Sequence, residues 1–189
     1  MSIELRRARP DDAGFLLELI TDEETRPFLG GRAGETLEDV LAEIERSERE
    51  PLEHGWFIVE LDGERAGCVG FHRTNERNRI AEAGRFVIHP SYRGRRIGDE
   101  VARLFQRHLL VELDFHRIEL QIYGFNERAI AHAERSGFVR EGLKRKAYFR
   151  HGAWQDAVVF SLLREDLDQE REIAPSSSSG LKPNGPSAA

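Results

Sequence analysis

Hydrophobic residues recur along the chain with two different spacings, and the spacing switches several times before about residue 165. Apolar positions three or four residues apart predict amphipathic helices, whereas alternating or short continuous apolar runs predict strands. The resulting order is strand, two helices, three strands, helix, strand, helix and two strands. This order predicts a mixed α/β (α+β) domain in which helices cover both faces of a mostly antiparallel sheet.

Helix ends and tight turns carry recognisable signals. Thr36 stands three residues before Asp39, which is the spacing of a capping box at the start of the second helix. The third helix is predicted from about Gly98 to Glu112. Asp62-Gly63 and His151-Gly152 separate pairs of apolar runs and predict hairpin turns, because such turns need residues that tolerate a positive φ.

Composition narrows the class of protein. The chain has 189 residues, 39% hydrophobic and 33% charged, and no apolar run approaches the ~20 residues that a membrane span needs. The single cysteine, Cys68, cannot form a disulfide within the chain, and we expect a cytoplasmic protein without a membrane partner. We expect one domain over residues 1–170, followed by a disordered tail at 171–189 rich in Ser, Pro and Gly.

A basic loop stands between the fourth predicted strand and the third predicted helix. It reads "HPSYRGRRIGDE", residues 89–100. The first amides of a helix lack partners within the helix and favour an anion, so the loop is a candidate phosphate site. Gly94 and Gly98 let a ligand approach the backbone. Charge-assisted contacts can come from Arg93, Arg95 and Arg96. The loop alone is also typical of a solvated basic loop, and a net charge of -6 disfavours a nucleic-acid partner.

A second motif, "NERAIAHAERSGFVREG", follows about 30 residues downstream. The two motifs in this order resemble the GNAT superfamily of acyl-CoA-dependent N-acetyltransferases, and within it the RimJ/RimL-like group with its spermidine-acetyltransferase relatives. The resemblance is strong from Trp56 to Asp168 and weaker from Ile3 to Glu53. It implies the GNAT fold, with a sheet of about six to seven strands and about four helices. It also implies acetyl-CoA as co-substrate and no metal.

The resemblance assigns a cofactor site residue by residue. The family's phosphate loop, Q/R-x-x-G-x-G/A, begins here at Arg93 and ends at Gly98, and Arg96 stands where the family has its central glycine. Asn126 matches an asparagine that contacts the cofactor. The implied cofactor-binding residues are Val87, Ile88, Arg93, Gly94, Arg95, Arg96, Ile97, Gly98 and Asn126.

Catalytic residues are less completely assigned. The resemblance sets Glu82 where a strand glutamate can accept the proton of the amine, and His72 and His116 are secondary candidates. Relatives use a tyrosine or a serine as the general acid, and this chain has Ala133 and Ala129 at those two positions. The remaining candidates for the general acid are a water molecule, Tyr123, Ser136 and Tyr148.

The implied function is transfer of an acyl group to a primary amine, by direct attack in a ternary complex. The acceptor is a protein N-terminus, a polyamine or another small amine, and a homodimer is compatible with the resemblance. Because this tyrosine and serine are missing, a second interpretation is a non-catalytic module that binds or senses acyl-CoA. The eight acids between Glu35 and Glu53 are either a solvated helix face or a region that attracts a cationic acceptor.

Overall fold

The computed structural model describes residues 2–30, 34–94 and 96–167. The predicted tail at 171–189 lies outside these residues, as does the predicted domain end at 170. The described strands are β1 (Ile3–Arg7), β2 (His54–Leu61), β3 (Glu64–Asn75), β4 (Ile80–Ile88), β5 (Arg117–Tyr123), β6 (Val139–Arg150) and β7 (Ala153–Leu163). The described α-helices are α1 (Ala13–Thr21), α2 (Leu37–Arg49), α3 (Ile97–Arg107) and α4 (Glu127–Arg135).

All seven strands form one sheet in the order β1-β2-β3-β4-β5-β7-β6. Neighbouring strands are antiparallel except β4 and β5, which are parallel and are joined by α3. The predicted fold class and order of elements are therefore confirmed. The third helix differs in detail, because α3 widens into a π-helical turn over His108–Glu112 instead of continuing as one α-helix.

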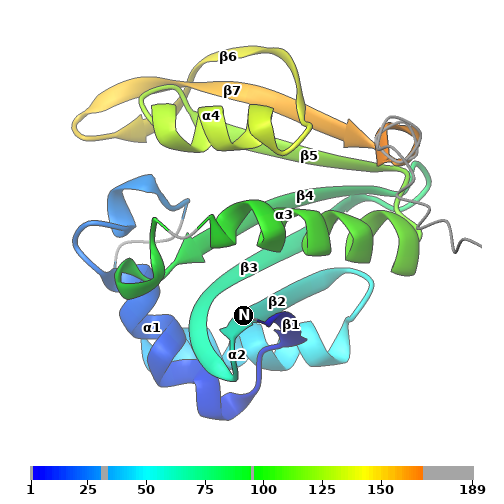
Figure 1. The fold of residues 1–189 in the computed structure, drawn as a ribbon. Coiled ribbons are helices and arrows are strands. Elements are labelled where there is room, and N and C mark those ends of the chain that lie inside the picture. The colour runs from blue at the N-terminus through cyan, green and yellow to red at the C-terminus, as the bar shows by residue number, and fades with distance from the viewer. Residues whose placement is uncertain (1, 31–33, 95, 168–189) are drawn as a thin grey trace, which may run out of the picture.

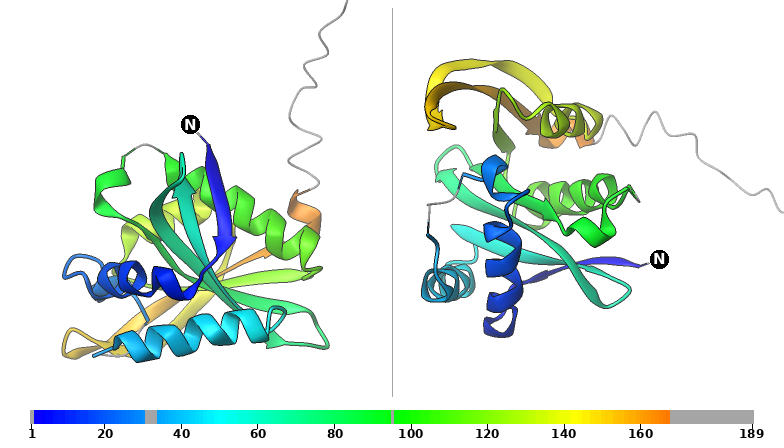
Figure 2. Two further views of the ribbon diagram at one scale, coloured as in Figure 1. Left: turned by 90° about the horizontal axis from the view of Figure 1, so that it is seen from below. Right: turned by 90° about the vertical axis from the view of Figure 1, so that its left-hand side faces the viewer.

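Helices cover both faces of the sheet, as the alternation of β2 side chains requires (Figures 1 and 2). Trp56 and Ile58 pack in the core beneath α1 and α2, whereas Phe57 between them packs in the core beneath α3. Helix α4 lies against β5 and β7, where Ala133 meets Phe160. None of the helices in the described part of the chain is long and apolar enough to span a bilayer.

The two parallel strands separate soon after they meet. Residues Ile80–Glu82 of β4 pair with Arg117–Glu119 of β5, and beyond these residues the two strands do not pair with each other. The later part of β4 keeps its pairing with β3, and Leu120–Tyr123 keeps its pairing with β7. The sheet therefore opens into two arms that diverge from the Glu82–Glu119 pair, as Figure 1 shows between β4 and β5.

A bulge in β4 accompanies this divergence. Cys68 pairs with Val87 and Gly70 pairs with Gly84, so two residues of β4 stand opposite Val69 of β3. Arg85, in the bulge, has a φ of 51°. A bulge bends its strand and increases the local twist. The bend therefore contributes to the separation of β4 from β5.

The capping box of α2 provides a test of the local fold. Thr36 Oγ1 accepts the Asp39 N–H at 3.2 Å, and Asp39 Oδ2 accepts the Thr36 N–H at 2.8 Å. We expect Thr36→Ala to lower the free energy of unfolding by about 1 kcal/mol, because one N-terminal amide of α2 loses its partner. Urea denaturation measures this change.

Thr21→Ala is the matched control. The Thr21 hydroxyl donates to the Leu17 carbonyl of its own helix, so its loss should change stability by less than about 0.5 kcal/mol. Equal effects of the two substitutions would contradict a specific contribution from the cap.

Candidate functional site

The basic loop leaves the end of β4 and turns sharply into α3. Gly94 has a φ of 82°, and Arg96 has φ 55° and ψ 18°, so both backbones are left-handed. The Asp99 N–H reaches the Arg96 carbonyl at 3.2 Å, and the amides of Ile97 and Gly98 come before it, at the free end of the helix. The predicted loop thus has the backbone geometry of an anion site, with an arginine in a conformation that favours glycine.

Arg93 has a structural task in this loop. Its Nε donates to the Ile88 carbonyl at 3.1 Å, and its guanidinium donates to Thr25 Oγ1 at 3.1 Å and lies 3.5 Å from a Glu24 carboxylate oxygen. The side chain therefore fastens the loop to the segment after α1. Arg95 lies outside the described residues, and its predicted role stays a prediction.

Helix α4 approaches the start of α3 from the other arm of the sheet. A Cβ atom at Gly98 would lie 3.3 Å from Nε2 of His132, so any larger residue at this position would press on the His132 ring. Burial lowers the pKa of His132, which is therefore neutral at pH 7. Asn126 caps α4, with its Oδ1 accepting the Ala129 N–H at 3.1 Å. The two predicted motifs thus lie on opposite sides of the opening between β4 and β5.

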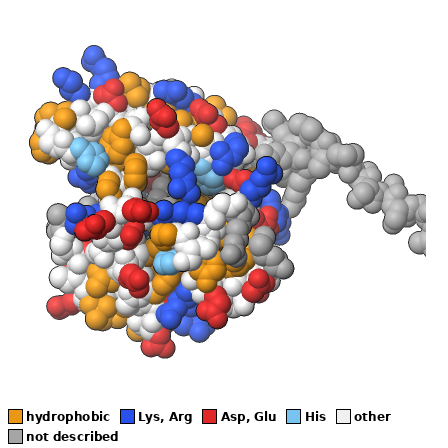
Figure 3. All heavy atoms as spheres, turned by 60° about the vertical axis from the view of Figure 1, so that its left-hand side comes forward, with side chains coloured by type: hydrophobic (Ala, Val, Ile, Leu, Met, Phe, Trp, Pro, Cys, Tyr) orange, Lys and Arg blue, Asp and Glu red, His pale blue; other side chains and the backbone are white. Residues whose placement is uncertain are grey.

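The surface is hollowed between the two arms. In Figure 3 a hollow runs between the part of the molecule that holds β5, β6 and β7 and the part that holds the other strands. Lys and Arg side chains lie along this hollow, with Asp and Glu side chains beside them. Charges of both signs therefore border the mouth.

Glu82 stands at the point where the arms diverge, as the last residue of β4 that pairs with β5. Its Oε2 accepts a hydrogen bond of 2.7 Å from Nε2 of Gln121 on β5. His72 of β3 pairs with Glu82 in register, so its side chain projects from the same face of the sheet. The predicted base is thus half-buried beside the opening, with one carboxylate oxygen already hydrogen-bonded.

The amide of Gln121 is held in one orientation by its neighbours. Gln121 Oε1 accepts from Nζ of Lys144 at 2.8 Å and from the hydroxyl of Tyr148 at 3.0 Å. Because a lysine can only donate, the amide oxygen must face Lys144 and the amide nitrogen must face Glu82. Burial and the nearby Glu82 carboxylate raise the pKa of Tyr148, so its hydroxyl keeps its proton at neutral pH.

The other candidates for acid or base are placed differently. The Tyr123 hydroxyl accepts from Nε of Arg150 at 3.0 Å and lies in the same cluster as Tyr148. Ser136 follows α4, with its hydroxyl 3.5 Å from the His132 ring. His116 precedes β5, at the end of the β4–β5 pairing away from the opening. Of the three hydroxyl candidates, Tyr148 is the one that joins the Glu82 network.

The floor beside Glu82 is formed by two glycines that face each other. Gly84 is two residues from Glu82 on β4, so the two positions project to the same side, and Gly84 pairs with Gly70 of β3. A Cβ at Gly70 would lie 3.0 Å from the Gly55 carbonyl oxygen, whereas one at Gly84 would meet nothing within 4 Å. The paired glycines leave this part of the face free of side chains.

Most acids of the Glu35–Glu53 run have partners within the chain. Asp39 closes the capping box of α2. Glu43 lies 3.2 Å from the His54 ring and 3.5 Å from the Arg85 guanidinium. Other ion pairs within the protein involve Glu45, Glu50 and Glu53. These contacts favour a structural role for the run over attraction of a cationic acceptor.

Cys68 is buried in the core beneath α1 and α2. Its thiol donates to the Arg85 carbonyl at 3.3 Å, and burial raises its pKa to about 11. A thiolate is the reactive form of cysteine, so this residue is unsuited to a covalent thioester route.

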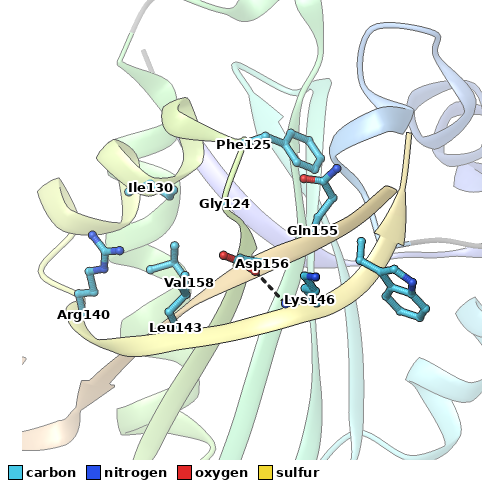
Figure 4. Close-up of a pocket in the computed structure, with 10 residues that line it drawn as sticks. Gly124, Phe125, Ile130, Arg140, Leu143, Lys146, Gln155, Asp156 and Val158 are labelled. Carbon is cyan, nitrogen blue, oxygen red and sulfur yellow. Dashed lines mark hydrogen bonds between the residues drawn. The ribbon is translucent and has the colours of Figure 1, made fainter. Parts of the chain in front are cut away.

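A second hollow lies on the other side of the β6–β7 hairpin (Figure 4). It has a volume of about 610 Å³ and lies between α4 and the hairpin. Its lining consists of Gly124, Phe125, Ile130, Arg140, Leu143, Lys146, Trp154, Gln155, Asp156 and Val158. None of the sequence-predicted site residues that the structure describes lines it. In the described ranges, no group of three or more His, Cys, Asp and Glu side chains is arranged to hold a metal ion.

Sequence reasoning missed Gln121, Lys144 and Arg150. Gln121 had a signal, because "RIELQIY" alternates polar and apolar residues and therefore places Gln121 with Glu119 on one face of β5. No sequence signal placed Lys144 and Arg150 on this face, because the register of β6 against β7 shifts between Lys144 and Tyr148. A shift of this kind breaks the alternation on which such reasoning depends.

Comparison with known proteins gives a consistent family. The sequence profile of the acetyltransferase (GNAT) domain matches residues 2–139. The uncharacterized N-acetyltransferase YokL of Bacillus subtilis, derived from the SPbeta prophage, is 25% identical over 167 residues, covering 88% of this chain and 93% of that protein. The putative ribosomal N-acetyltransferase YdaF of the same organism is 28% identical, covering 89% and 95% respectively.

Spermidine acetyltransferases are also similar. Spermidine N(1)-acetyltransferase of Escherichia coli is 31% identical over 116 residues, covering 61% of this chain and 62% of that protein. The crystal structure of spermidine N-acetyltransferase from Vibrio cholerae, in complex with CoA and spermine, superposes with a TM-score of 0.79 at 22% identity. The superposition covers 87% of this chain and 96% of the Vibrio cholerae protein. At this identity the likeness shows that the two proteins share a fold.

The left-handed backbone of Arg96 gives a direct test of the loop. We expect Arg96→Gly to raise the free energy of unfolding by roughly 0.5–1 kcal/mol, because glycine adopts this conformation without steric cost. Affinity for coenzyme A should be unchanged or tighter, since the backbone amide is retained. Thermal denaturation and isothermal titration calorimetry measure the two effects.

Arg96→Ala separates backbone from side chain. It removes the guanidinium but keeps the Cβ atom, so it should bind coenzyme A as the parent does without the gain in stability. A large loss of affinity in both variants would mean that the Arg96 side chain itself holds the phosphate.

Proposed function

The chain belongs to the GNAT family of acetyltransferases, and from that premise we propose that it transfers an acetyl group from acetyl-CoA to a primary amine by direct attack in a ternary complex. The observation that carries the proposal is the divergence of β4 and β5 directly beyond Glu82, with the basic loop beside one arm and Asn126 beside the other. Such an opening lets a thioester and an amine meet next to a carboxylate. Family membership supports an enzyme over a non-catalytic acyl-CoA module.

The residues around the opening fit coenzyme A. The left-handed Gly94 and Arg96 aim the first amides of α3 away from the helix, where a pyrophosphate can accept from them. Val87 and Ile88 lie on the part of β4 that has no β5 partner, so backbone groups on that edge are available to an extended pantetheine arm. The Ile88 carbonyl accepts from Arg93, and the Val87 groups face β3, so the Ile88 N–H is the donor left on this edge. Acetyl-CoA supplies the thioester carbonyl that the amine attacks.

Glu82 is proposed as the base. An amine must lose a proton before or during attack, and a carboxylate within hydrogen-bond reach can take it. Gln121 occupies one carboxylate oxygen and fixes the orientation of the group, so the other oxygen is available to the amine. The carboxylate is thus held ready at the point where the two arms meet.

Tyr148 is proposed as the general acid that gives its proton to the thiolate of coenzyme A as the thiolate leaves. Its raised pKa keeps the hydroxyl protonated across the neutral range, and its contact with Gln121 places it one amide group away from Glu82. Much of the rate enhancement can come from holding two substrates in contact, which reduces the demand for a strong acid. This accounts for activity with alanine at positions 129 and 133.

Calorimetric titration tests the cofactor half of the proposal. We expect saturable binding of acetyl-CoA with a dissociation constant below about 1 mM, because several backbone amides at the start of α3 can donate to the pyrophosphate. Dephospho-CoA is a matched probe that keeps the pyrophosphate. Absence of saturable heat at millimolar acetyl-CoA would exclude the proposed site.

The pH dependence of Glu82→Gln tests the base. The substitution preserves shape and the acceptor oxygen facing Gln121, but it removes the group that takes the proton. We expect kcat to fall by about 10²-fold at low pH, where the amine is protonated, and the deficit to shrink as pH approaches the pKa of the amine. A profile parallel to that of the parent at every pH would remove Glu82 as base.

A further inference from the structure

The face around Glu82 holds several other carboxylates, and each is paired within the chain. Glu119 accepts from Nε of Arg117 at 2.8 Å. Glu141 is bound by the same guanidinium and by the Ser161 hydroxyl at 2.8 Å. Glu43, above the same face, has its ion pairs with His54 and Arg85. These acids are already neutralised by the protein.

The cations of the same face are in the opposite situation. Lys144 donates to the neutral amide oxygen of Gln121, and Arg150 donates to the Tyr123 hydroxyl at 3.0 Å and to the Phe149 carbonyl at 3.1 Å. Within the described ranges, no carboxylate lies within ion-pair distance of Lys144 or Arg150. Their positive charges are therefore left without a counter-ion.

These cations are close to the proposed base. Hydrogen bonds of 2.7 Å and 2.8 Å join the two ends of one amide group, that of Gln121, to Glu82 and to Lys144. Tyr148 contacts the same amide oxygen, and its ring meets the ring of Tyr123, to which Arg150 donates. A substrate amine at Glu82 would thus have a positive charge within the length of a small molecule.

We propose that the acceptor is a primary amine that also carries a carboxylate, with its amine at Glu82 and its carboxylate at Lys144 and Arg150. This assignment rests on the proposed function and specifies its substrate. Lys144 contributes a point charge and Arg150 a planar guanidinium, a combination suited to a carboxylate. Gln121 sets the separation of the two subsites, since its amide stands between them.

A dicationic acceptor fits this face less well. A second ammonium group would meet Lys144 or Arg150, and like charges repel. The carboxylates that would otherwise receive it are paired with arginines, so its binding would require those pairs to open. Charge complementarity therefore separates this site from one built for a polyamine.

A matched series of amines tests the inference. The three probes 4-aminobutanoate, 4-aminobutanamide and 1,4-diaminobutane share one skeleton and differ in end-group charge; ω-amino acids of two to six carbons, each with its amide, extend the series. Alanine dipeptides ending in Glu, Gln or Lys distinguish a free amino acid from a peptide acceptor. We expect kcat/KM for the best carboxylate to exceed that of its amide and diamine by at least about tenfold.

Charge variants assign the preference to the proposed subsite. Lys144→Gln should raise KM for the carboxylate substrate by about tenfold with little change in kcat, and Lys144→Glu should shift the preference toward the diamine. Lys146→Gln is the matched control, because Lys146 lines the hollow on the α4 side of the hairpin. It should leave the preference unchanged.

The outcomes separate the inference from the proposed function. Acetyl transfer to neutral or dicationic amines in preference to carboxylates, or a preference that Lys144→Glu does not alter, would overturn the inference and leave the proposed function standing. Absence of transfer to every amine in the series, with acetyl-CoA bound, would overturn the proposed function itself. A carboxylate preference equally sensitive to Lys146→Gln would also overturn the assignment to Lys144.

Discussion

The separation of two parallel strands is the constraint on which the rest of this structure depends. β4 and β5 share backbone hydrogen bonds only as far as the pair Glu82–Glu119, and beyond it each keeps a single neighbour. Unpaired strand edges normally invite aggregation or need cover. Here the two edges face each other across an opening, which gives a ligand access to backbone groups inside the sheet. The bulge at Arg85 and the arginine-rich loop are both adapted to this opening.

The proposed function draws on residues of both arms. The loop and Glu82 belong to the β4 arm, whereas Gln121 and Asn126 belong to the β5 arm. Only one side-chain hydrogen bond described above, from Gln121 to Glu82, crosses directly between the two strands at the site. Lys144 reaches it from β6, the far edge of the sheet. Glu82, the proposed base, is therefore oriented by the half of the sheet that also carries Lys144 and Arg150.

Periodicity and turn chemistry were sufficient to predict the order of elements, because α2 keeps a regular stripe with its Thr36 cap and Asp62-Gly63 closes an ordinary hairpin. Family motifs predicted roles for the loop, Glu82 and Asn126, and the structure brings all three to the opening between β4 and β5. The task of Arg93 could not be predicted, since its partner Thr25 lies 68 positions away in the sequence. Arg85 and Lys144 were equally inaccessible, because register shifts in β4 and β6 break the two-residue period at both positions. Local sequence rules do not predict contacts between distant segments or shifts in strand register.

The facing glycines on β3 and β4 have a consequence for how this protein can change. A methyl group at Gly84 would touch no atom of the described residues, yet it would project beside Glu82, whereas the same change at Gly70 would press on the Gly55 carbonyl. Position 84 is thus a site where bulk can be added toward the proposed acceptor at little expense to folding. Acceptor size can drift there during evolution independently of stability, while position 70 keeps the floor of the site in place.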